Sequence, residues 1–322
     1  MKLIIYMPAL NEEGNIERVI TNLPQNLAGV DEILYLVVDD GSTDNTAALA
    51  LATGAHVISH DKNLGVGAAF HSAVNFALET CADILVGIDA DGQFDPEEIP
   101  DLIAPILVNG AEMVMGNRFV AGRPKSMSKI RYWGNKQVSK ILNYVGGRKY
   151  QDVSCGFRAY SQDALLHLNL FGSFTYTHET ILSLLYQGLR VIELPVKVQY
   201  LTDRKSRVAG SISAYALQTS KIIFRVLLDY RPMQVFGSFG GILIVIGAGF
   251  VMFMLAHYVF MGSYTPYKSF GFIGLGFFIF GLLVFLLALI ADMLNRQRIN
   301  QDKLLYEVKK LKYSSLERSR IK

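Results

Sequence analysis

The chain has 322 residues, 51% of them hydrophobic, and a formal net charge of +3 at pH 7. This length suffices for one large domain or two smaller ones. The net charge is too small for a strongly basic protein, so we expect no nucleic-acid partner. Two cysteines in a chain without a secretory-type start favour a reducing compartment and no disulfide framework.

The first part of the chain alternates short apolar runs with helical patterns. Four runs are typical of strands: 3–7, 33–38, 56–59 and 84–88. Helical patterns follow three of them, from about 11–13 onward, over 45–52 and over 65–78. Ser42 or Thr43 is expected to cap the second of these helices. Strands that alternate with helices predict an α/β fold with a Rossmann-like, mostly parallel sheet covered on both faces.

Polar clusters stand where three of these strands end. They are Pro-Ala-Leu-Asn-Glu at 8–12, Asp39 with Asp40, and Asp-Ala-Asp at 89–91. The carboxyl ends of parallel strands share one edge of the sheet, and ligands bind beyond that edge. The sequence therefore predicts that the three clusters form one polar binding site.

Further elements are predicted downstream of this site. Residues 113–115 form a strand that leads to Arg118, residues 126–144 form a long helix, and residues 190–200 are strand-like. A basic, glycine-containing loop follows at 204–213. Residues 214–230 then form an amphipathic helix that we expect at a membrane interface.

Two charge-free runs, 236–261 and 270–293, are each long enough to cross a bilayer, which requires about 20 apolar residues. Lysines and arginines flank the outer ends of the pair, whereas the loop between the runs carries a single lysine. The positive-inside rule predicts that both termini lie in the cytoplasm, in a multi-pass protein of the plasma membrane. Gly237 and Gly241 form a small-xxx-small pair suited to close helix packing, which with the charged tail allows a homo-oligomer.

Asp89 and Asp91 form a D-x-D element after a buried strand. Two carboxylates at this spacing bind a hard divalent cation through oxygen. Mg²⁺ or Mn²⁺ held there would bridge a diphosphate and neutralise the charge on a departing nucleoside diphosphate. The element is common by itself, so its meaning depends on the motifs around it.

Six motifs occur in order along the chain. They are P-A-L-N-E-E from Pro8, V-D-D-G-S-T-D from Val38, N-L-G from Asn63, D-A-D-G-Q from Asp89, D-V-S-C-G-F-R from Asp152 and R-x-x-R-x-A-G-x-x-S from Arg204 to Ser213. This set resembles the GT-A fold of family 2 glycosyltransferases. With two C-terminal spans, nearly the whole chain resembles the polyprenyl-phosphate branch, which includes dolichyl-phosphate mannose synthases and bactoprenol glucosyltransferases.

The resemblance implies four parts: a cytoplasmic GT-A catalytic domain (1–213), a juxtamembrane amphipathic helix (214–232), a transmembrane hairpin (233–294) and a charged cytoplasmic tail (295–322). It implies a nucleotide-sugar site, in which Asp39 or Asp40 accepts an N–H of the base. The residues of that site would be Pro8, Ala9, Asn11, Glu12, Asp39, Asp40, Asp89, Ala90 and Asp91. The implied metal ligands are Asp89, Asp91 and Gln93.

The acceptor implied by the resemblance is a lipid phosphate, whose oxygens favour arginine as a donor. The implied acceptor residues are Arg118, Arg131, Asn135, Arg204 and Arg207. A phosphate acceptor is already largely a dianion near neutral pH and needs no strong general base. We therefore expect inverting single displacement driven by electrostatics and positioning, with Asp91, Arg118, Arg131 and Asp152 as catalytic residues.

Several alternatives stay open. Asp152 either orients the acceptor, serves as a residual base, or holds Arg158 or a nearby loop. The motifs do not distinguish UDP-glucose with undecaprenyl phosphate, the leading pair, from GDP-mannose or other donors. A processive polysaccharide synthase is disfavoured because its Q-x-x-R-W element is absent around Trp133. A non-catalytic sugar-nucleotide-binding membrane scaffold is disfavoured because donor and acceptor groups are both present.

Overall fold

The computed structural model describes residues 1–124, 127–169, 176–199 and 231–321, together with Lys221, Phe224, Leu227 and Leu228; side chains are described as far as residue 315. By its contacts the chain divides into two units. The first comprises Met1–Ala216 with Asp302–Lys322, and the second comprises Leu217–Gln301. The loop with Arg204 and Arg207 and most of the expected interfacial helix lie outside the described residues.

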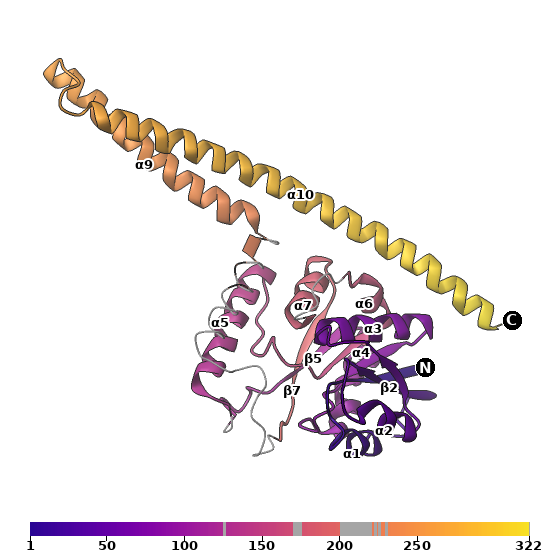
Figure 1. Ribbon diagram of the computed structural model, residues 1–322. Helices are drawn as coiled ribbons and strands as arrows, with labels where there is room; N and C mark the ends of the chain where they lie inside the picture. Colours follow the sequence, from indigo (N-terminus) through magenta and orange to yellow (C-terminus); the bar gives the residue numbers. More distant parts are fainter. Residues whose placement is uncertain are drawn as a thin grey trace. The chain divides into compact units, whose positions relative to one another are not determined.

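The described part of the first unit is an α/β structure (Figure 1). Its strands are β1 (Lys2–Ala9), β2 (Glu32–Asp39), β3 (His56–Ser59), β4 (Ile84–Gly87), β5 (Met113–Asn117), β6 (Arg158–Ser161) and β7 (Val191–Pro195). Its helices are α1 (Ile16–Thr21), α2 (Thr46–Ala52), α3 (Val66–Glu79), the 3₁₀ turn η1 (Pro96–Glu98), α4 (Ile99–Asn109), α5 (Lys129–Gly146), α6 (Gln162–His167) and α7 (Tyr176–Tyr186).

The strands form one sheet in the order β3-β2-β1-β4-β6-β5-β7. Only β6 runs antiparallel to its neighbours β4 and β5, so the predicted mostly parallel sheet is confirmed. The sequence did not predict β6, because its four residues begin with an arginine and show no alternation of apolar and polar side chains. The strand-like stretch at 190–200 is shorter than predicted and ends at Pro195.

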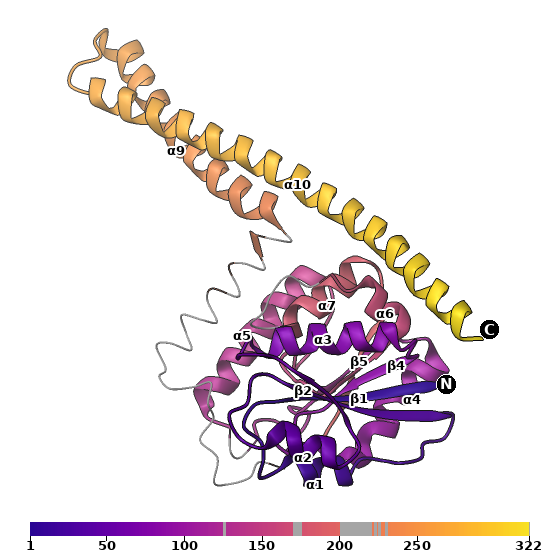
Figure 2. The ribbon, with the colours of Figure 1, turned by 45° about the vertical axis from the view of Figure 1, so that its right-hand side comes forward.

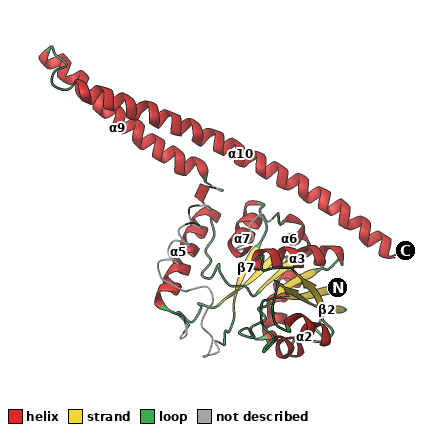
Figure 3. Cartoon of the chain, viewed as in Figure 1, coloured by secondary structure: helices red, strands yellow, loops and turns green. Residues whose placement is uncertain are grey.

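Helices cover both faces of the sheet, with α3 on one side and α1 and α2 on the other (Figure 2). Figure 3 shows the strands enclosed between these helices. The central strands are buried on both faces, which explains why β1 and β4 read as continuous apolar runs instead of alternating patterns. The resulting core positions the polar ends of β1, β2 and β4 at one edge.

The end of the last helix, α10 (Lys268–Ile321), packs on α6 within the first unit. The ring of Tyr306 stacks on the ring of His167 with centroids 3.9 Å apart, and its hydroxyl donates to Asp163 at 2.9 Å. Lys309 donates its ammonium group to the carbonyl oxygen of Leu168 at 2.7 Å. This part of the charged tail therefore contributes to the packing of the first unit.

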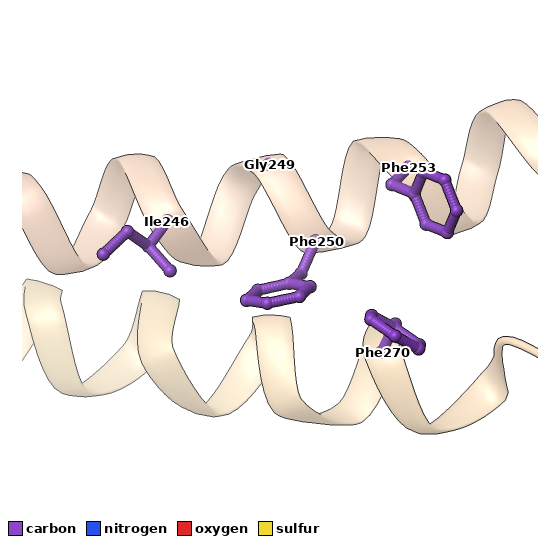
Figure 4. A pocket seen from close by; sticks show the side chains of 5 residues that line it. All are labelled: Ile246, Gly249, Phe250, Phe253 and Phe270. Atoms are coloured by element: carbon purple, nitrogen blue, oxygen red, sulfur yellow. The ribbon is translucent and has the colours of Figure 1, made fainter.

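The second unit is a hairpin of α9 (Pro232–Met261) and the apolar part of α10, which lie side by side in Figures 1 and 2. Both helices are long and apolar enough to cross a membrane, with mean hydropathy of 2.4 and 2.9 over their most apolar windows. A groove of about 380 Å³ between them is lined by Ile246, Gly249, Phe250, Phe253 and Phe270 (Figure 4).

Glycines bring the two helices into close contact. A Cβ on Gly247 would lie 2.5 Å from the backbone nitrogen of Phe278, and a Cβ on Gly240 would lie 2.9 Å from the carbonyl oxygen of Gly281. The sequence singled out Gly237 and Gly241 instead, and a Cβ on Gly241 would meet no described atom within 4 Å. The small-residue principle therefore applies to this hairpin, but at different glycines.

Replacing Gly247 by valine is expected to destabilise the hairpin, because the new side chain would overlap the backbone of α10. Overpacking of this kind costs about 1–3 kcal/mol. Unfolding of the purified chain in SDS, followed by far-UV circular dichroism, measures the effect. The matched control is Gly249→Val, which adds the same side chain one half-turn away where no described atom lies within 4 Å. Equal destabilisation by both variants would contradict the packing interpretation.

Candidate active site

Three strand ends meet at one edge of the sheet. Ala9 at the end of β1 pairs with Asp39 at the end of β2, and Tyr6 in β1 pairs with Gly87 at the end of β4. Because all three strands are parallel, the loops that follow them leave the sheet on the same side. The structure thus brings together the three polar clusters that the sequence placed there.

The first two clusters are tied to each other by hydrogen bonds. The backbone N–H of Asn11 donates to Ser42 Oγ at 2.9 Å, and the backbone N–H of Thr43 donates to Asn11 Oδ1 at 2.8 Å. The backbone N–H of Glu12 donates to Thr46 Oγ1 at 2.8 Å. The predicted cap at Ser42 or Thr43 is wrong, because helix α2 begins after Asn45 without a side-chain cap. Ser42 joins the two loops instead.

Asp39 and Asp40 have different surroundings. Asp40 accepts the backbone N–H groups of Leu64 and Gly65 at 2.9 and 2.8 Å, and His60 Nδ1 lies 2.7 Å from its Oδ1. The Asp40 carboxylate therefore anchors the N-L-G loop. Asp39 accepts the backbone N–H of Ser42 through Oδ1 at 3.1 Å.

The residue after these two aspartates is a glycine, Gly41, and the chain just before the N-L-G loop approaches this glycine closely. Gly41 has a φ of +77°, and a Cβ there would lie 2.5 Å from the carbonyl carbon of Lys62. A side chain would thus be strained by the backbone conformation and would collide with the neighbouring loop.

Asp89 and Asp91 follow β4 and influence each other electrostatically. Burial and the charge of Asp91 raise the pKa of Asp89 to about 7, Glu12 adds to the effect, and Arg118 opposes it. Gln93 donates its backbone N–H to Asp91 Oδ1 at 3.0 Å and its side-chain amide to Asp91 Oδ2 at 2.7 Å. Gln93 thereby orients Asp91. Ala90 between them is buried in the core.

The donor set at this edge suits a hard divalent cation. Both carboxylates offer oxygen, and their mutual repulsion would be relieved by a cation. Within the described ranges, no group of three or more His, Cys, Asp or Glu side chains is arranged to hold a metal. Mg²⁺ is typically bound by one or two carboxylates plus substrate phosphates, so Asp89 and Asp91 fit that pattern.

Arg118 follows β5 at the same edge and forms a bidentate ion pair. Its Nε donates to Asp152 Oδ2 at 2.6 Å and its Nη2 donates to Asp152 Oδ1 at 2.9 Å. Nη2 also donates to Ser154 Oγ at 3.0 Å. The Asp152 side chain is fully buried, and the Arg118 side chain is 12% exposed. The guanidinium is therefore held in one orientation.

Asp152 is ionised and fully engaged. Burial opposes its ionisation, but the hydrogen bonds and charge of Arg118 hold its pKa below the usual range. Its backbone N–H donates to Glu193 Oε1 at 2.7 Å, which ties the loop to β7. The sequence analysis left Arg158 open as its partner, whereas the structure pairs it with Arg118.

Arg158 has a structural role. Its side chain is fully buried, and it donates to the carbonyl oxygens of Val153, Cys155 and Thr177 at 2.6–2.8 Å. It thus braces the loop that carries Asp152 against the start of α7. Ser154 and Glu193 also hold this loop, and the sequence did not single out either residue. The only sequence signal was the position of Ser154 within the D-V-S-C-G-F-R motif.

Arg131 and Asn135 lie in the first two turns of α5 and are half-buried. Ser128 caps this helix by accepting the backbone N–H of Arg131 at 3.3 Å. The rings of Phe119 and Tyr132, which follow Arg118 and Arg131 in the chain, meet edge to face with centroids 5.1 Å apart. The start of α5 is therefore anchored beside the loop that carries Arg118.

The family model described as "Glycosyl transferase family 2" matches residues 4–168, half of the chain. The chain belongs to glycosyltransferase family 2. As a member of this family, the protein is a glycosyltransferase, and the family expected from the ordered motifs is confirmed.

Named relatives are transferases that act on polyprenyl phosphates. The glycosyltransferase is 30% identical over 249 residues to the UDP-N-acetylglucosamine–dolichyl-phosphate N-acetylglucosaminyltransferase of Methanococcus voltae; the match covers 70% of this chain and 96% of the relative. It is 29% identical over 231 residues to the undecaprenyl-phosphate mannosyltransferase of Micrococcus luteus, covering 67% of this chain and 91% of the relative.

A solved structure confirms the fold. The glucosyl-3-phosphoglycerate synthase of Mycobacterium tuberculosis, in complex with Mn²⁺, UDP-glucose and phosphoglyceric acid, superposes with a TM-score of 0.53 at 24% identity. The match covers 69% of this chain and 79% of that chain. The glycosyltransferase therefore has the GT-A-like fold that the motifs implied.

The buried Asp152–Arg118 pair is expected to be essential for stability. Asp152→Asn removes the counter-charge of Arg118 and should cost about 3–5 kcal/mol of unfolding free energy. Urea denaturation of the detergent-solubilised chain measures this. The control is Glu32→Gln, which breaks the partly exposed Lys2–Glu32 pair (3.2 Å) and should cost below about 1 kcal/mol. A loss of similar size in both variants would contradict the assignment.

His178 in α7 is expected to contribute a pH dependence to the stability of the chain. Burial, followed by the charge of Arg158, lowers the pKa of His178 from 6.5 to about 4. The unfolded chain therefore binds a proton at a pH where the folded chain does not. Taken alone, His178 contributes a loss of roughly 3 kcal/mol as the pH falls from 6.5 to 4, whereas Asp89, with its pKa raised to about 7, opposes that loss over the same range. In urea titrations, His178→Leu should therefore gain roughly 3 kcal/mol of unfolding free energy relative to the unchanged chain as the pH falls from 6.5 to 4, and a constant difference would contradict the assignment.

Proposed function

We propose that this glycosyltransferase transfers a sugar from a nucleoside diphosphate to a polyprenyl phosphate at the cytoplasmic face of the plasma membrane. One observation carries the proposal: two acidic side chains suited to a divalent cation and an arginine fixed by an ion pair follow strands that end at the same sheet edge. Burial and the charge of Asp91 raise the pKa of Asp89, and the positive charge of Arg118 opposes that rise, so Arg118 and Asp89 interact electrostatically. A donor diphosphate and an acceptor phosphate would each find a complementary charge there.

The donor half of the site is assigned to the first three clusters. Asp39 is the better candidate than Asp40 to accept an N–H of the base, because Asp40 is engaged with the N-L-G loop. Pro8, Ala9, Asn11 and Glu12 would line the nucleotide. Asp89 and Asp91, with Gln93 orienting Asp91 or joining it as a ligand, would hold Mg²⁺ or Mn²⁺. When bound, that cation would neutralise the negative charge that develops on the departing nucleoside diphosphate.

The acceptor half is assigned to Arg118, Arg131 and Asn135. Arg118 presents a guanidinium whose orientation is set by Asp152 before the acceptor arrives, so little reorganisation accompanies binding. Asp152 serves to position Arg118 and is a poor base, because its oxygens already accept from Arg118 and Ser154 and its pKa is low. A phosphate dianion attacks without a base. Arg204 and Arg207 are proposed to bind the acceptor phosphate as well.

A polyprenyl phosphate acceptor is supported by the activities for which the relatives from M. voltae and M. luteus are named and by two helices apolar enough to cross a membrane. The cations that flank the hairpin support a topology with both termini in the cytoplasm. Undecaprenyl phosphate and UDP-glucose are the proposed pair, and the relatives add UDP-N-acetylglucosamine and a mannose donor as alternatives. The product would be a lipid-linked monosaccharide formed by inversion.

The proposal is tested with purified full-length chain in detergent, undecaprenyl phosphate, Mg²⁺ or Mn²⁺, and radiolabelled UDP-glucose, UDP-N-acetylglucosamine and GDP-mannose. Label should enter the organic phase from one donor, and EDTA should abolish transfer. Asp91→Asn should lower kcat/KM at least about 100-fold, because a metal ligand stabilises the charge of the leaving group.

The control for this variant is Asp95→Asn in the same loop. Asp95 accepts the backbone N–H of Glu97 at 3.0 Å and caps η1, so its loss should affect transfer little. A chain that binds nucleotide but transfers none of the three sugars would contradict the proposed combination of these donors with a lipid-phosphate acceptor.

A further inference from the structure

The last part of α10, from residue 302 onward, has two unlike faces, one of which is packed. The packed face consists of Asp302, Tyr306, Lys309 and Tyr313, which recur at helical spacing and are half-buried or buried. Asn169 donates its side-chain amide to Asp302 Oδ1 at 3.0 Å and accepts from Lys309 Nζ at 2.9 Å. Together with the stacking of Tyr306, these contacts fix the rotation of the helix on α6.

The opposite face is apolar and exposed. It carries Leu304, Val308 and Leu311, which are 67%, 61% and 70% exposed, and we call these three residues the apolar stripe. Charged residues at 296, 298, 302 and 303 separate the stripe from the charge-free run 270–293, so the stripe is not part of the predicted span. A row of exposed apolar side chains outside a span indicates a contact with another molecule.

The apolar stripe has the spacing of a coiled-coil seam. In the heptad abcdefg, Leu304 and Leu311 take d positions, and Val308 takes the a position between them. A β-branched residue at a combined with leucine at d favours two parallel strands. A second copy of the same helix presents the identical stripe and therefore fits this pattern.

The charges beside the stripe are complementary between two copies. Glu307 takes a g position and Lys312 takes the e position of the next heptad. In a parallel pair, g of one helix faces e of the following heptad in its partner, so each pair of helices would contain two Glu307–Lys312 contacts. Within one helix these residues are five positions apart and are not neighbours.

Membrane anchoring supplies the parallel orientation, a step that rests on the proposed function. Copies that cross one membrane with the same topology carry the end of α10 out on the same side and in the same direction. Confinement to one membrane also raises the effective concentration of one stripe for another. A seam with only three apolar residues per helix needs that increase.

We propose that the apolar stripe binds the stripe of a second copy of this chain and forms a short, parallel, two-stranded coiled coil over residues 304–311. Tyr306 and Lys309 lie on the other side of the helix and keep their contacts with α6 in the pair. Anionic headgroups fit the stripe less well, because Glu307 borders it and would be repelled.

Single cysteines test the pairing in the full chain. Cys81 is replaced by serine, buried Cys155 is kept, and the protein is placed in phosphatidylcholine liposomes at successive dilutions with lipid. Equivalent d residues meet across a parallel seam within reach of a disulfide, so Leu304→Cys and Leu311→Cys should form linked dimers on oxidation with copper phenanthroline. The matched control is Lys303→Cys, which is exposed but off the seam and should stay monomeric.

Charge exchange tests the register. In the Leu304→Cys chain, Glu307→Lys places like charges across the seam and should lower the initial rate of cross-linking about fivefold, because two contacts are lost at once. Lys312→Glu should have the same effect. The double variant, Glu307→Lys with Lys312→Glu, should restore the rate because both contacts are reversed. A change confined to one helix would not be rescued in this way.

Three outcomes would overturn the proposal. They are equal cross-linking at positions 303 and 304, a double variant no faster than the single ones, and a cysteine at 304 that does not cross-link but is protected from a membrane-impermeant maleimide, which would assign the stripe to the bilayer. Sugar transfer is measured on the same liposomes. Transfer without cross-linking would reject the coiled coil and leave the proposed function intact, whereas cross-linking without transfer would support the coiled coil and reject that function.

Discussion

The electrostatic repulsion between two carboxylates after β4, Asp89 and Asp91, is the interaction that the surrounding residues must balance. Asp89 and Asp91 repel each other in a partly buried setting, which raises the pKa of Asp89 to about 7. Arg118 counters that repulsion, Asp152 fixes Arg118, and Glu193 with Arg158 fixes the loop of Asp152. Negative and positive groups thus follow one another from Asp89 through Arg118 to Asp152. Under the proposed function, a divalent cation and two phosphates would continue this alternation.

Much of this arrangement was predictable, because strand ends and loop motifs are local in sequence. The apolar runs of β1, β2 and β4 were recognised from composition, and the parallel sheet followed from their alternation with helices. The meeting of Asn11, Asp39 and Asp89 at one edge required no further information. Arg118 was placed correctly at the end of β5 for the same reason.

The parts that escaped prediction depend on contacts distant in sequence. Strand β6 is short and is stabilised by β4 and β5 on either side. Asp39 and Asp40 look equivalent in the sequence, and only the return of the 63–65 loop distinguishes them. Which glycines pack depends on how α9 and α10 face each other. The donor sugar is also unresolved, because the assigned residues address the base, diphosphate and metal, which many sugar nucleotides share.

The catalytic unit is discontinuous along the chain. Its last piece begins at Asp302, after the whole apolar hairpin, and Tyr306 and Lys309 from that piece complete the surface of α6. During synthesis, both apolar helices must therefore leave the ribosome before the contacts between the end of α10 and α6 can form. Until then the surface of His167 that Tyr306 covers stays open to solvent, and the enzyme reaches its final packing only after its apolar helices have been made.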